Sequence, residues 1–218
     1  MSFVTCHWSL PFAEAPLYAI LDTSIGPDLS CSASLEALLR AGVKVVQFRH
    51  KGEFRRVHFE QCLMLARRIH ELGGRFLVND RADIAKLCEA DGVHLGQEDL
   101  PPEKARRFLG EGMVIGYSTH NLEQAQAACG LPVDYIAVGP IFPTSTKENP
   151  DPAVGLELIT KIRSLTTKPL VGIGGITMEN SRAVLEAGAD AVAVIRDLLT
   201  AHDIEAHARE MLTALKQQ

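Results

Sequence analysis

The 218-residue sequence lacks any apolar run that approaches the roughly 20 residues of a membrane-spanning helix. Its first residues also lack the basic segment and apolar core of a secretory signal. Positive charge is not in excess, because 22 Lys and Arg stand against 27 Asp and Glu, a formal net charge of -5. Bulk electrostatic binding to nucleic acid or to an anionic membrane is therefore not expected, although an anionic small molecule remains possible as a ligand. We expect a cytoplasmic protein.

Closely spaced cysteine pairs are also lacking. The five cysteines are odd in number and widely spaced, with no Cys-x-x-Cys pair among Cys6, Cys31, Cys62, Cys88 and Cys129. This pattern predicts reduced thiols rather than a disulfide framework. The 46% apolar and 22% charged residues are typical of an ordinary globular protein. A chain of this length buries enough surface to fold without a disulfide or a structural metal.

Short apolar runs alternate with amphipathic stretches from about residue 16 to the end of the chain, and a helix is predicted after every strand. The predicted strands are Leu17 to Leu21, Val43 to Phe48, Arg75 to Val78, Gly92 to His94, Met113 to Gly116, Tyr135 to Val138, Pro169 to Gly172 and Ala191 to Val194. The predicted helices are near 33–41, 55–72, 81–90, 102–109, 121–129, 155–165, 178–187 and 203–216.

Eight strand–helix units in just over 200 residues predict an α/β fold, a single parallel (β/α)8 TIM barrel. An open doubly wound sheet fits less well, because it usually closes with five or six strands. No break in composition marks a second domain. Residues 16–218 are therefore predicted to form the barrel, and residues 1–15 a short N-terminal extension against its outside.

Cationic side chains follow the second predicted strand. Functional residues of such barrels lie where the strands end and the next loops begin. Gln47, Arg49 and Lys51 alternate along an extended segment, so they share one face. An Arg and a Lys that converge at this end of a barrel form an anion-binding site. The alternative interpretation is that these residues are merely the solvent-exposed end of a strand.

Two aspartates follow the next two strands. Asp80 comes directly after Asn79, and Asp99 closes the segment that begins at His94. Each aspartate precedes a predicted helix, and Asp is a preferred N-cap, so each one alone fits a capping role. Together, beside the cations, they fit a Mg²⁺ ion shared with substrate phosphates.

Hydroxyls and glycines follow the later strands. Ser118 fits either a helix cap or a ligand contact. The long loop 140–154 has the composition of a functional loop, with three hydroxyls and a cation in Thr144, Ser145, Thr146 and Lys147. The backbone at 174–176 and 194–196 is placed where such barrels bind phosphate. Two anion sites in one barrel indicate a transfer between two phosphorylated ligands.

The strand-end motifs resemble, in order and spacing, those of the thiamine phosphate synthase family over residues 17 to about 199. They are Gln47-Phe48-Arg49-His50-Lys51, Val78-Asn79-Asp80, Gly92-Val93-His94-Leu95-Gly96-Gln97-Glu98-Asp99, Gly139-Pro140 through Thr144-Ser145-Thr146-Lys147, and Gly172-Ile173-Gly174-Gly175-Ile176.

The resemblance implies condensation of 4-amino-2-methyl-5-pyrimidinylmethyl diphosphate with 4-methyl-5-(2-phosphoethyl)thiazole, which gives thiamine phosphate and diphosphate. It implies that Mg²⁺ is held by Asp80 and Asp99. By the same resemblance, the residues that bind the pyrimidine diphosphate are Gln47, Arg49, Lys51, Asn79, Ser118 and Lys147. Those that bind the thiazole phosphate are Thr144, Thr146, Gly175, Ile195 and Arg196. Their neighbours Phe48, His50 and Ser145 are further candidates for substrate binding. The catalytic residues would be Arg49, Lys51, Ser118 and Lys147.

Two positions depart from the family pattern, since His50 stands where Glu is common and Arg196 where Ser is usual. Arg196 puts the side-chain contact with the thiazole phosphate in doubt but not the backbone contact. Two other functions stay open. One is a thiazole tautomerase with an acid–base histidine at a position like His120, and the other is a non-catalytic thiamine-precursor binding protein. The sequence also leaves the oligomeric state open, a homo-oligomer included.

Overall fold

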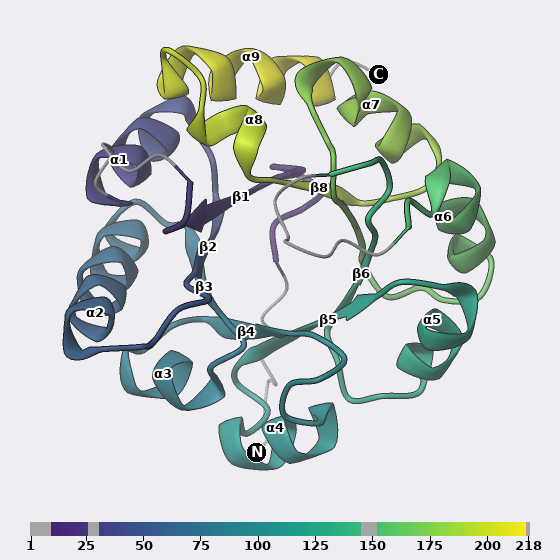
Figure 1. Ribbon diagram of the computed structural model, residues 1–218, viewed down its shortest axis with the longest axis horizontal. Coiled ribbons are helices and arrows are strands. Elements are labelled where there is room, and N and C mark those ends of the chain that lie inside the picture. Colours follow the sequence, from purple (N-terminus) through teal and green to yellow (C-terminus); the bar gives the residue numbers. More distant parts are fainter. Residues whose placement is uncertain (1–9, 26–30, 145–151, 217–218) are drawn as a thin grey trace, which may run out of the picture.

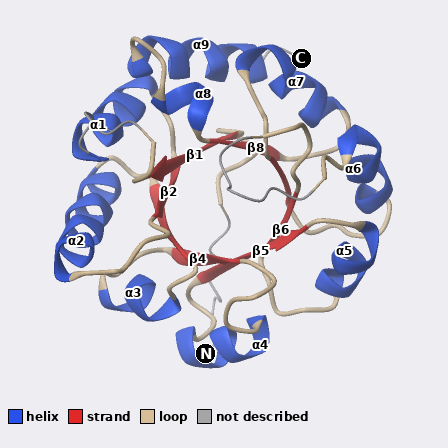
Figure 2. Ribbon diagram, viewed as in Figure 1, coloured by secondary structure: helices blue, strands red, loops and turns tan. Residues whose placement is uncertain are grey.

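A computed structural model describes residues 10–25, 31–144 and 152–216 of the protein (Figure 1). Eight parallel strands close into one barrel in chain order, and helices form a ring around it (Figure 2). The strands are β1 (Leu17–Asp22), β2 (Val45–Arg49), β3 (Arg75–Asn79), β4 (Gly92–Leu95), β5 (Val114–Thr119), β6 (Tyr135–Val138), β7 (Leu170–Ile173) and β8 (Ala191–Val194). The predicted (β/α)8 barrel is confirmed.

Helices follow the strands as the amphipathic stretches predicted. They are α1 (Cys31–Ala41), α2 (Arg56–Glu71), α3 (Ala82–Leu87), α4 (Pro102–Leu109), α5 (Leu122–Cys129), α6 (Gly155–Arg163), α7 (Met178–Glu186), α8 (Arg196–Leu199) and α9 (Ile204–Lys216). The short α8 was not predicted, and in Figure 1 it lies inside the ring, between β8 and α9. Among the described residues, no helix has both the length and the apolar character needed to cross a membrane.

The strands are buried on both faces, which is why their sequences are continuous apolar runs rather than alternating ones. One face packs against the helices in a large cluster that includes Phe48 and Leu65. The other face fills the barrel interior with a smaller cluster that includes Tyr18, Leu77 and Tyr135. The two clusters fix the barrel as a solid core, so ligands can reach only its ends.

The part of the N-terminal extension that the structure describes, residues 10–15, does not lie wholly outside the barrel as expected. Phe12 is 4% exposed and belongs to the interior cluster. Its ring meets that of Tyr135 edge to face, with 6.0 Å between the centroids. Burial of a Phe side chain contributes about 2 kcal/mol, so this part of the extension stabilises the barrel from within.

The cysteines that the structure describes are free thiols, as the sequence predicted: Cys31, Cys62, Cys88 and Cys129. Cys6 lies outside the described residues.

Candidate active site

The predicted site residues of β2 to β5 gather at the end of the barrel where the strands finish, which we call the barrel mouth. Parallel strands all end on the same side, so residues far apart in the chain meet there. Arg49 ends β2, Asn79 ends β3, and Ser118 is in the last two residues of β5. The shared direction of the strands therefore brings together what the sequence presented as separate motifs.

Arg49 is held by an acidic partner that the sequence analysis missed. Its Nη1 donates to Oδ2 of Asp22, the last residue of β1. The side chains of Arg49 and Asp22 are only 11% and 1% exposed. The other Asp22 oxygen, Oδ1, accepts from the backbone N of Ser24 at 2.9 Å and from its Oγ at 2.6 Å. The strand-end rule applied to the other aspartates would have found Asp22.

We expect Asp22→Asn to lower the free energy of unfolding by about 2 kcal/mol, because the buried Arg49 guanidinium would lose its charged partner. Urea denaturation measures this loss. Glu60→Gln is the matched control, since it neutralises one end of the exposed Arg56–Glu60 pair, whose side chains are 91% and 56% exposed. That change should cost less than about 1 kcal/mol. Equal losses in the two variants would show that the Asp22–Arg49 pair has no special role.

A lysine and two carboxylates form the next part of the mouth. Lys51 Nζ donates to Asp80 Oδ2 at 2.6 Å. Burial raises the pKa of the Asp80 carboxyl above its usual value, Lys51 opposes this rise, and the adjoining Asp99 carboxyl adds to it. Two acidic side chains in contact beside a cation are a place of high negative charge, which a divalent cation would relieve.

The helix-cap alternative for these aspartates is wrong. Arg81 and Pro101 are the N-cap residues of α3 and α4. Asp80 has a φ of 63°, in the left-handed region, and its carboxylate faces Lys51. Asp99 Oδ2 instead accepts from the backbone N of Gly96 at 2.7 Å and thereby shapes the loop after β4. Neither carboxylate is used to start a helix, so both are available to a ligand at the mouth.

Two buried polar side chains, Gln47 and Asn79, line the barrel interior just beneath the mouth. Gln47 is 2% exposed and donates through Nε2 to the Tyr18 hydroxyl at 2.7 Å. Asn79 is 8% exposed, and its buried Nδ2 has no hydrogen-bond partner among the described residues. A buried amide without a partner is rare in a folded protein, and it marks a place where a ligand is expected to accept.

Ser118 is part of the mouth rather than of a helix cap. Its Oγ lies 2.8 Å from His94 Nε2. The cap of α5 is Asn121, whose side chain accepts from the backbone N of Gln124 at 2.9 Å. The capping alternative for Ser118 is therefore wrong.

Two candidate residues of the motif at 47–51 have side chains that point elsewhere. The Phe48 side chain is 1% exposed and packs between the strands and the helices, because successive side chains of a strand face opposite sides. The His50 ring stacks on His58 of α2, with 3.8 Å between centroids, and its Nδ1 lies 2.7 Å from Thr23 Oγ1. The buried Phe48 side chain is therefore closed to a ligand at the mouth, whereas the His50 ring is partly exposed.

The loops after β6 and β7 pack directly on each other. Phe142 N donates to Gly174 O at 3.0 Å, and Ile141 N to Ile173 O at 2.9 Å. Gly174 and Gly175 have φ of 93° and 65°, which side chains rarely adopt. A Cβ on Gly175 would lie 2.5 Å from the carbonyl oxygen of Pro143. Glycine is thus required for the two loops to approach.

The remaining predicted residues of this side are only partly described. Thr144 is partly exposed, whereas Ser145, Thr146 and Lys147 lie outside the described residues. Ile195 is the N-cap residue of α8 and Arg196 its first residue. The Arg196 side chain is exposed and makes no hydrogen bond or ion pair within the described part of the chain. It is therefore free to meet an anion.

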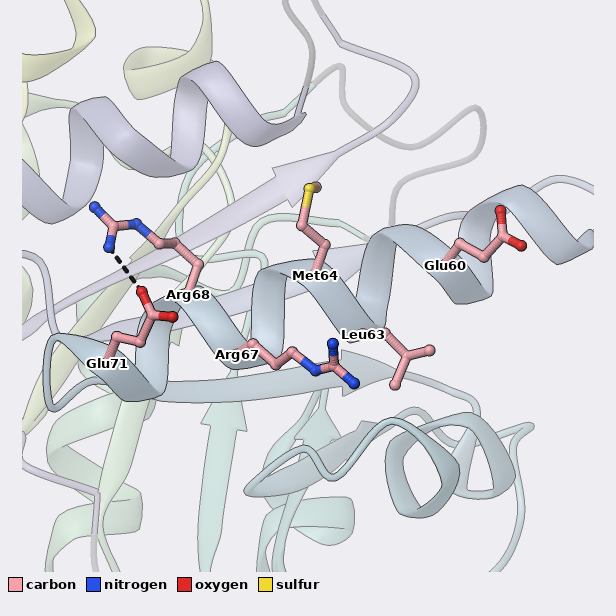
Figure 3. A pocket seen from close by; sticks show the side chains of 6 residues that line it. All are labelled: Glu60, Leu63, Met64, Arg67, Arg68 and Glu71. Carbon is pink, nitrogen blue, oxygen red and sulfur yellow. Dashed lines mark hydrogen bonds and ion pairs between the residues drawn. The ribbon is translucent and has the colours of Figure 1, made fainter.

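A surface hollow of about 420 Å³ lies away from the mouth, on the outward face of α2 (Figure 3). Its lining comes from this one helix: Glu60, Leu63, Met64, Arg67, Arg68 and Glu71. Arg68 donates to Glu71 there at 2.8 Å. The hollow contains none of the strand-end residues and is not a candidate active site.

A (β/α)8 barrel with cations, paired carboxylates and glycine-rich loops at its mouth defines an enzyme class that acts on phosphorylated small molecules. Residues 17–198 match the family described as thiamine monophosphate synthase. A thiamine-phosphate synthase of Koribacter versatilis (strain Ellin345) is 47% identical over 203 residues, 91% of this chain and 95% of the relative. One of Myxococcus xanthus (strain DK1622) is 39% identical over 209 residues, 96% of each chain.

A solved structure agrees with these relatives. The thiamine phosphate pyrophosphorylase from Pyrococcus furiosus superimposes with a TM-score of 0.85 at 33% identity, and the match covers 94% of this chain and 97% of that one. The chain belongs to the thiamine monophosphate synthase family. The resemblance seen in the strand-end motifs is thereby confirmed, and with it the expectation of a thiamine phosphate-forming transferase.

Proposed function

We propose that the chain condenses 4-amino-2-methyl-5-pyrimidinylmethyl diphosphate with 4-methyl-5-(2-phosphoethyl)thiazole and releases diphosphate. The observation that carries this proposal is the cluster in which Lys51 meets Asp80, with Asp99 in contact and Arg49 at the end of the neighbouring strand. It combines the cations that bind a diphosphate with the carboxylates that bind its metal. The second anion site, on the loops after β7 and β8, receives the thiazole phosphate.

The residues present fit a Mg²⁺ ion. Magnesium prefers oxygen ligands and is usually held by one or two carboxylates together with substrate phosphates and water. Asp80 and Asp99 supply that pair. Burial and the adjoining Asp99 carboxyl raise the pKa of Asp80 although Lys51 opposes the rise, so a bound cation would favour the ionised Asp80 carboxylate. When bound, Mg²⁺ neutralises charge that builds up on the leaving diphosphate.

The chain's own residues favour a reaction in which diphosphate leaves before the thiazole attacks. Arg49 and Lys51 bind the departing anion, and the family resemblance extends this role to Lys147, which lies outside the described residues. The orphaned Nδ2 of Asn79 donates to the pyrimidine. The thiazole nitrogen has no proton to lose, so no side chain need act as a general base. Cations and metal-binding carboxylates are therefore enough for the proposed reaction.

The thiazole phosphate binds on the other side of the mouth. The backbone at Gly175 and Ile195 donates to its phosphate, and Thr144, Thr146 and the exposed Arg196 complete the site. Arg196 supplies a charge-assisted contact at the position where the family pattern has Ser.

The test is incubation of the protein with both precursors and Mg²⁺, followed by chromatography for thiamine phosphate. The synthase forms it, a thiazole tautomerase returns only isomerised thiazole phosphate, and a binding protein returns both precursors unchanged. Asp80 and Asp99 would serve no purpose in the tautomerase reaction. The free thiols of Cys31, Cys62 and Cys129 support the further proposal that the enzyme works in the cytoplasm.

The raised pKa of Asp80 predicts a pH-dependent metal affinity. Protons and Mg²⁺ compete for the carboxylate, so the apparent affinity should weaken as pH falls through the raised pKa. In the metal-free protein, the folding stability contributed by Asp80 has the opposite pH dependence and falls as pH rises. The stabilising contribution of Asp80 is complete below its unfolded pKa, 3.8, and is lost as pH rises through the folded pKa. Calorimetric Mg²⁺ titrations from pH 3.8 upward measure the change in metal affinity, and urea denaturation over the same range measures the change in stability. Asp80→Asn should abolish both pH dependences.

A further inference from the structure

A chain of hydrogen bonds runs through the barrel interior and ends at the mouth. Gln47 Nε2 donates to the Tyr18 hydroxyl at 2.7 Å, and that hydroxyl lies 3.0 Å from the hydroxyl of Tyr135. The Tyr135 hydroxyl lies 2.8 Å from His94 Nδ1, and His94 Nε2 lies 2.8 Å from Ser118 Oγ. We call these five residues the interior chain. Residues far apart in sequence are thereby linked through their side chains alone.

The interior chain crosses the barrel rather than following its wall. Tyr18 is on β1 and Tyr135 on β6, strands that are not neighbours in the sheet. Their rings meet at 74° with 6.1 Å between centroids, and His94 stacks on Tyr135 with 5.6 Å between centroids. Gln47, Tyr18, Tyr135 and His94 are at most 6% exposed. Ser118 is the partly exposed end of the interior chain. The direction of these hydrogen bonds can therefore affect a ligand only through Ser118.

Counting protons gives the interior chain a direction. Burial raises the pKa of both tyrosine hydroxyls, so each keeps its one proton. The Tyr18 oxygen accepts from Gln47, and within the described part of the chain the Tyr135 oxygen is the one acceptor that its hydroxyl contacts. A buried proton needs an acceptor, so the Tyr18 proton goes to the Tyr135 oxygen. The Tyr135 proton then goes to His94 Nδ1, which must be the unprotonated ring nitrogen.

The same count fixes what Ser118 does. With Nδ1 accepting, neutral His94 carries its proton on Nε2 and donates it to Ser118 Oγ. The Ser118 oxygen is thus used as an acceptor on its buried side. Its own proton has no role in the interior chain and can be donated into the mouth.

We infer that the interior chain holds His94 as the Nε2–H tautomer and thereby makes Ser118 an obligatory donor to the substrate at the mouth. Tyr135 and His94 are then positioning residues, since they act through Ser118. The inference rests on the proposed function, and it adds that the Ser118 hydroxyl donates to an oxygen of the pyrimidine diphosphate as negative charge develops there. If the donors and acceptors of the interior chain were reversed, Ser118 would donate to His94 and could only accept hydrogen bonds from the substrate.

The tautomer can be measured without turnover. Long-range ¹H–¹⁵N correlation spectra of the ¹⁵N-histidine-labelled protein distinguish a protonated ring nitrogen from an unprotonated one, and His94→Gln identifies the His94 signals by their absence. We expect Nε2 protonated in the wild type and a rise of the Nδ1–H form in Tyr135→Phe. Tyr117→Phe is the matched control. It removes a hydroxyl from an outward-facing ring of β5 that packs among the helix-side cluster, and it should leave the spectrum unchanged.

Kinetics then test the coupling to Ser118. Loss of one preorganised donor to developing charge typically costs 10²- to 10³-fold in kcat, so we expect about a 10²-fold loss in Ser118→Ala. Tyr135→Phe should lose at least about tenfold, and the double variant should be no slower than Ser118→Ala alone, because both changes remove the same donor. Tyr117→Phe should match the wild type.

Three results would overturn the inference: an Nδ1–H tautomer in the wild type, multiplicative losses in the double variant, or wild-type kinetics in Tyr135→Phe with the fold intact by thermal unfolding. The spectra need no substrate. Absence of thiamine phosphate synthesis would therefore defeat the proposed function while leaving the tautomer result to stand, and an Nδ1–H tautomer in an active enzyme would defeat this inference alone.

Discussion

Asp80→Asn is expected to lower kcat at saturating Mg²⁺ by about 10³-fold, because the metal contributes several kcal/mol to stabilising the departing diphosphate. Asn is the informative substitution. Asp80 has a φ of 63°, and Asn tolerates the left-handed region while keeping the shape of the side chain. Alanine there would add backbone strain and confuse loss of fold with loss of function. Steady-state kinetics at several Mg²⁺ concentrations measure the effect.

Stability should move in the opposite direction to activity. The raised pKa of Asp80 means that its ionised form is unfavourable in the metal-free fold, so Asp80→Asn should unfold at the same temperature or higher. The matched control is Asp83→Asn, on the first turn of α3, where the carboxylate pairs with Arg81 at 2.6 Å on the surface. It should retain wild-type kcat. If Asp80→Asn remained active at all Mg²⁺ concentrations, this carboxylate would not be a metal ligand.

Gly175→Ala is expected to lower kcat/KM for the thiazole phosphate by about 10²-fold. The added Cβ would lie 2.5 Å from the Pro143 carbonyl oxygen and 2.8 Å from Phe142 Cβ, so the loop after β6 must move. A displacement of about 1 Å at a site that positions a substrate can cost this much. Because the loop contributes to the thiazole site, the effect should fall on KM for the thiazole phosphate more than on KM for the pyrimidine diphosphate.

Gly73→Ala is the matched control for Gly175→Ala, because it adds the same backbone strain without displacing a neighbouring loop. Gly73 has a φ of 68°, close to the 65° of Gly175, but a Cβ there meets nothing within 4 Å. Both variants lose about 1 kcal/mol of stability to the left-handed conformation, and only Gly175→Ala adds a clash. Initial-rate kinetics with each substrate varied in turn, together with urea denaturation, measure the two effects. Equal kinetic losses in both variants would place the cause in global destabilisation and not in the loop contact.

The barrel was predictable from local signals. Each strand is a short apolar run bounded by turn residues, and each helix has one apolar face, so the pattern of eight repeats requires no long-range information. The strand-end rule then located Arg49, Lys51, Asp80 and Asp99, because parallel strands put their ends together whatever the register. The same rule also indicates Asp22, the last residue of β1, which was not singled out because no neighbouring motif marks it.

Contacts across the barrel were not predictable in this way. Tyr18 and Tyr135 are 117 residues apart, and their meeting depends on the stagger of the strands and on which small residues leave room between them. A Cβ on Gly116, for example, would lie 2.0 Å from the Tyr135 ring. Phe12 was missed for a related reason, since it belongs to the interior cluster although the local sequence does not assign it to any element.

The most direct test measures thiamine phosphate and diphosphate together in reactions from which Mg²⁺, the pyrimidine diphosphate or the thiazole phosphate is omitted in turn. The proposed function predicts that the two products appear in equal amounts, and only when all three components are present. Wild-type rates without Mg²⁺, or an isomerised thiazole phosphate in a reaction without the pyrimidine diphosphate, would contradict it.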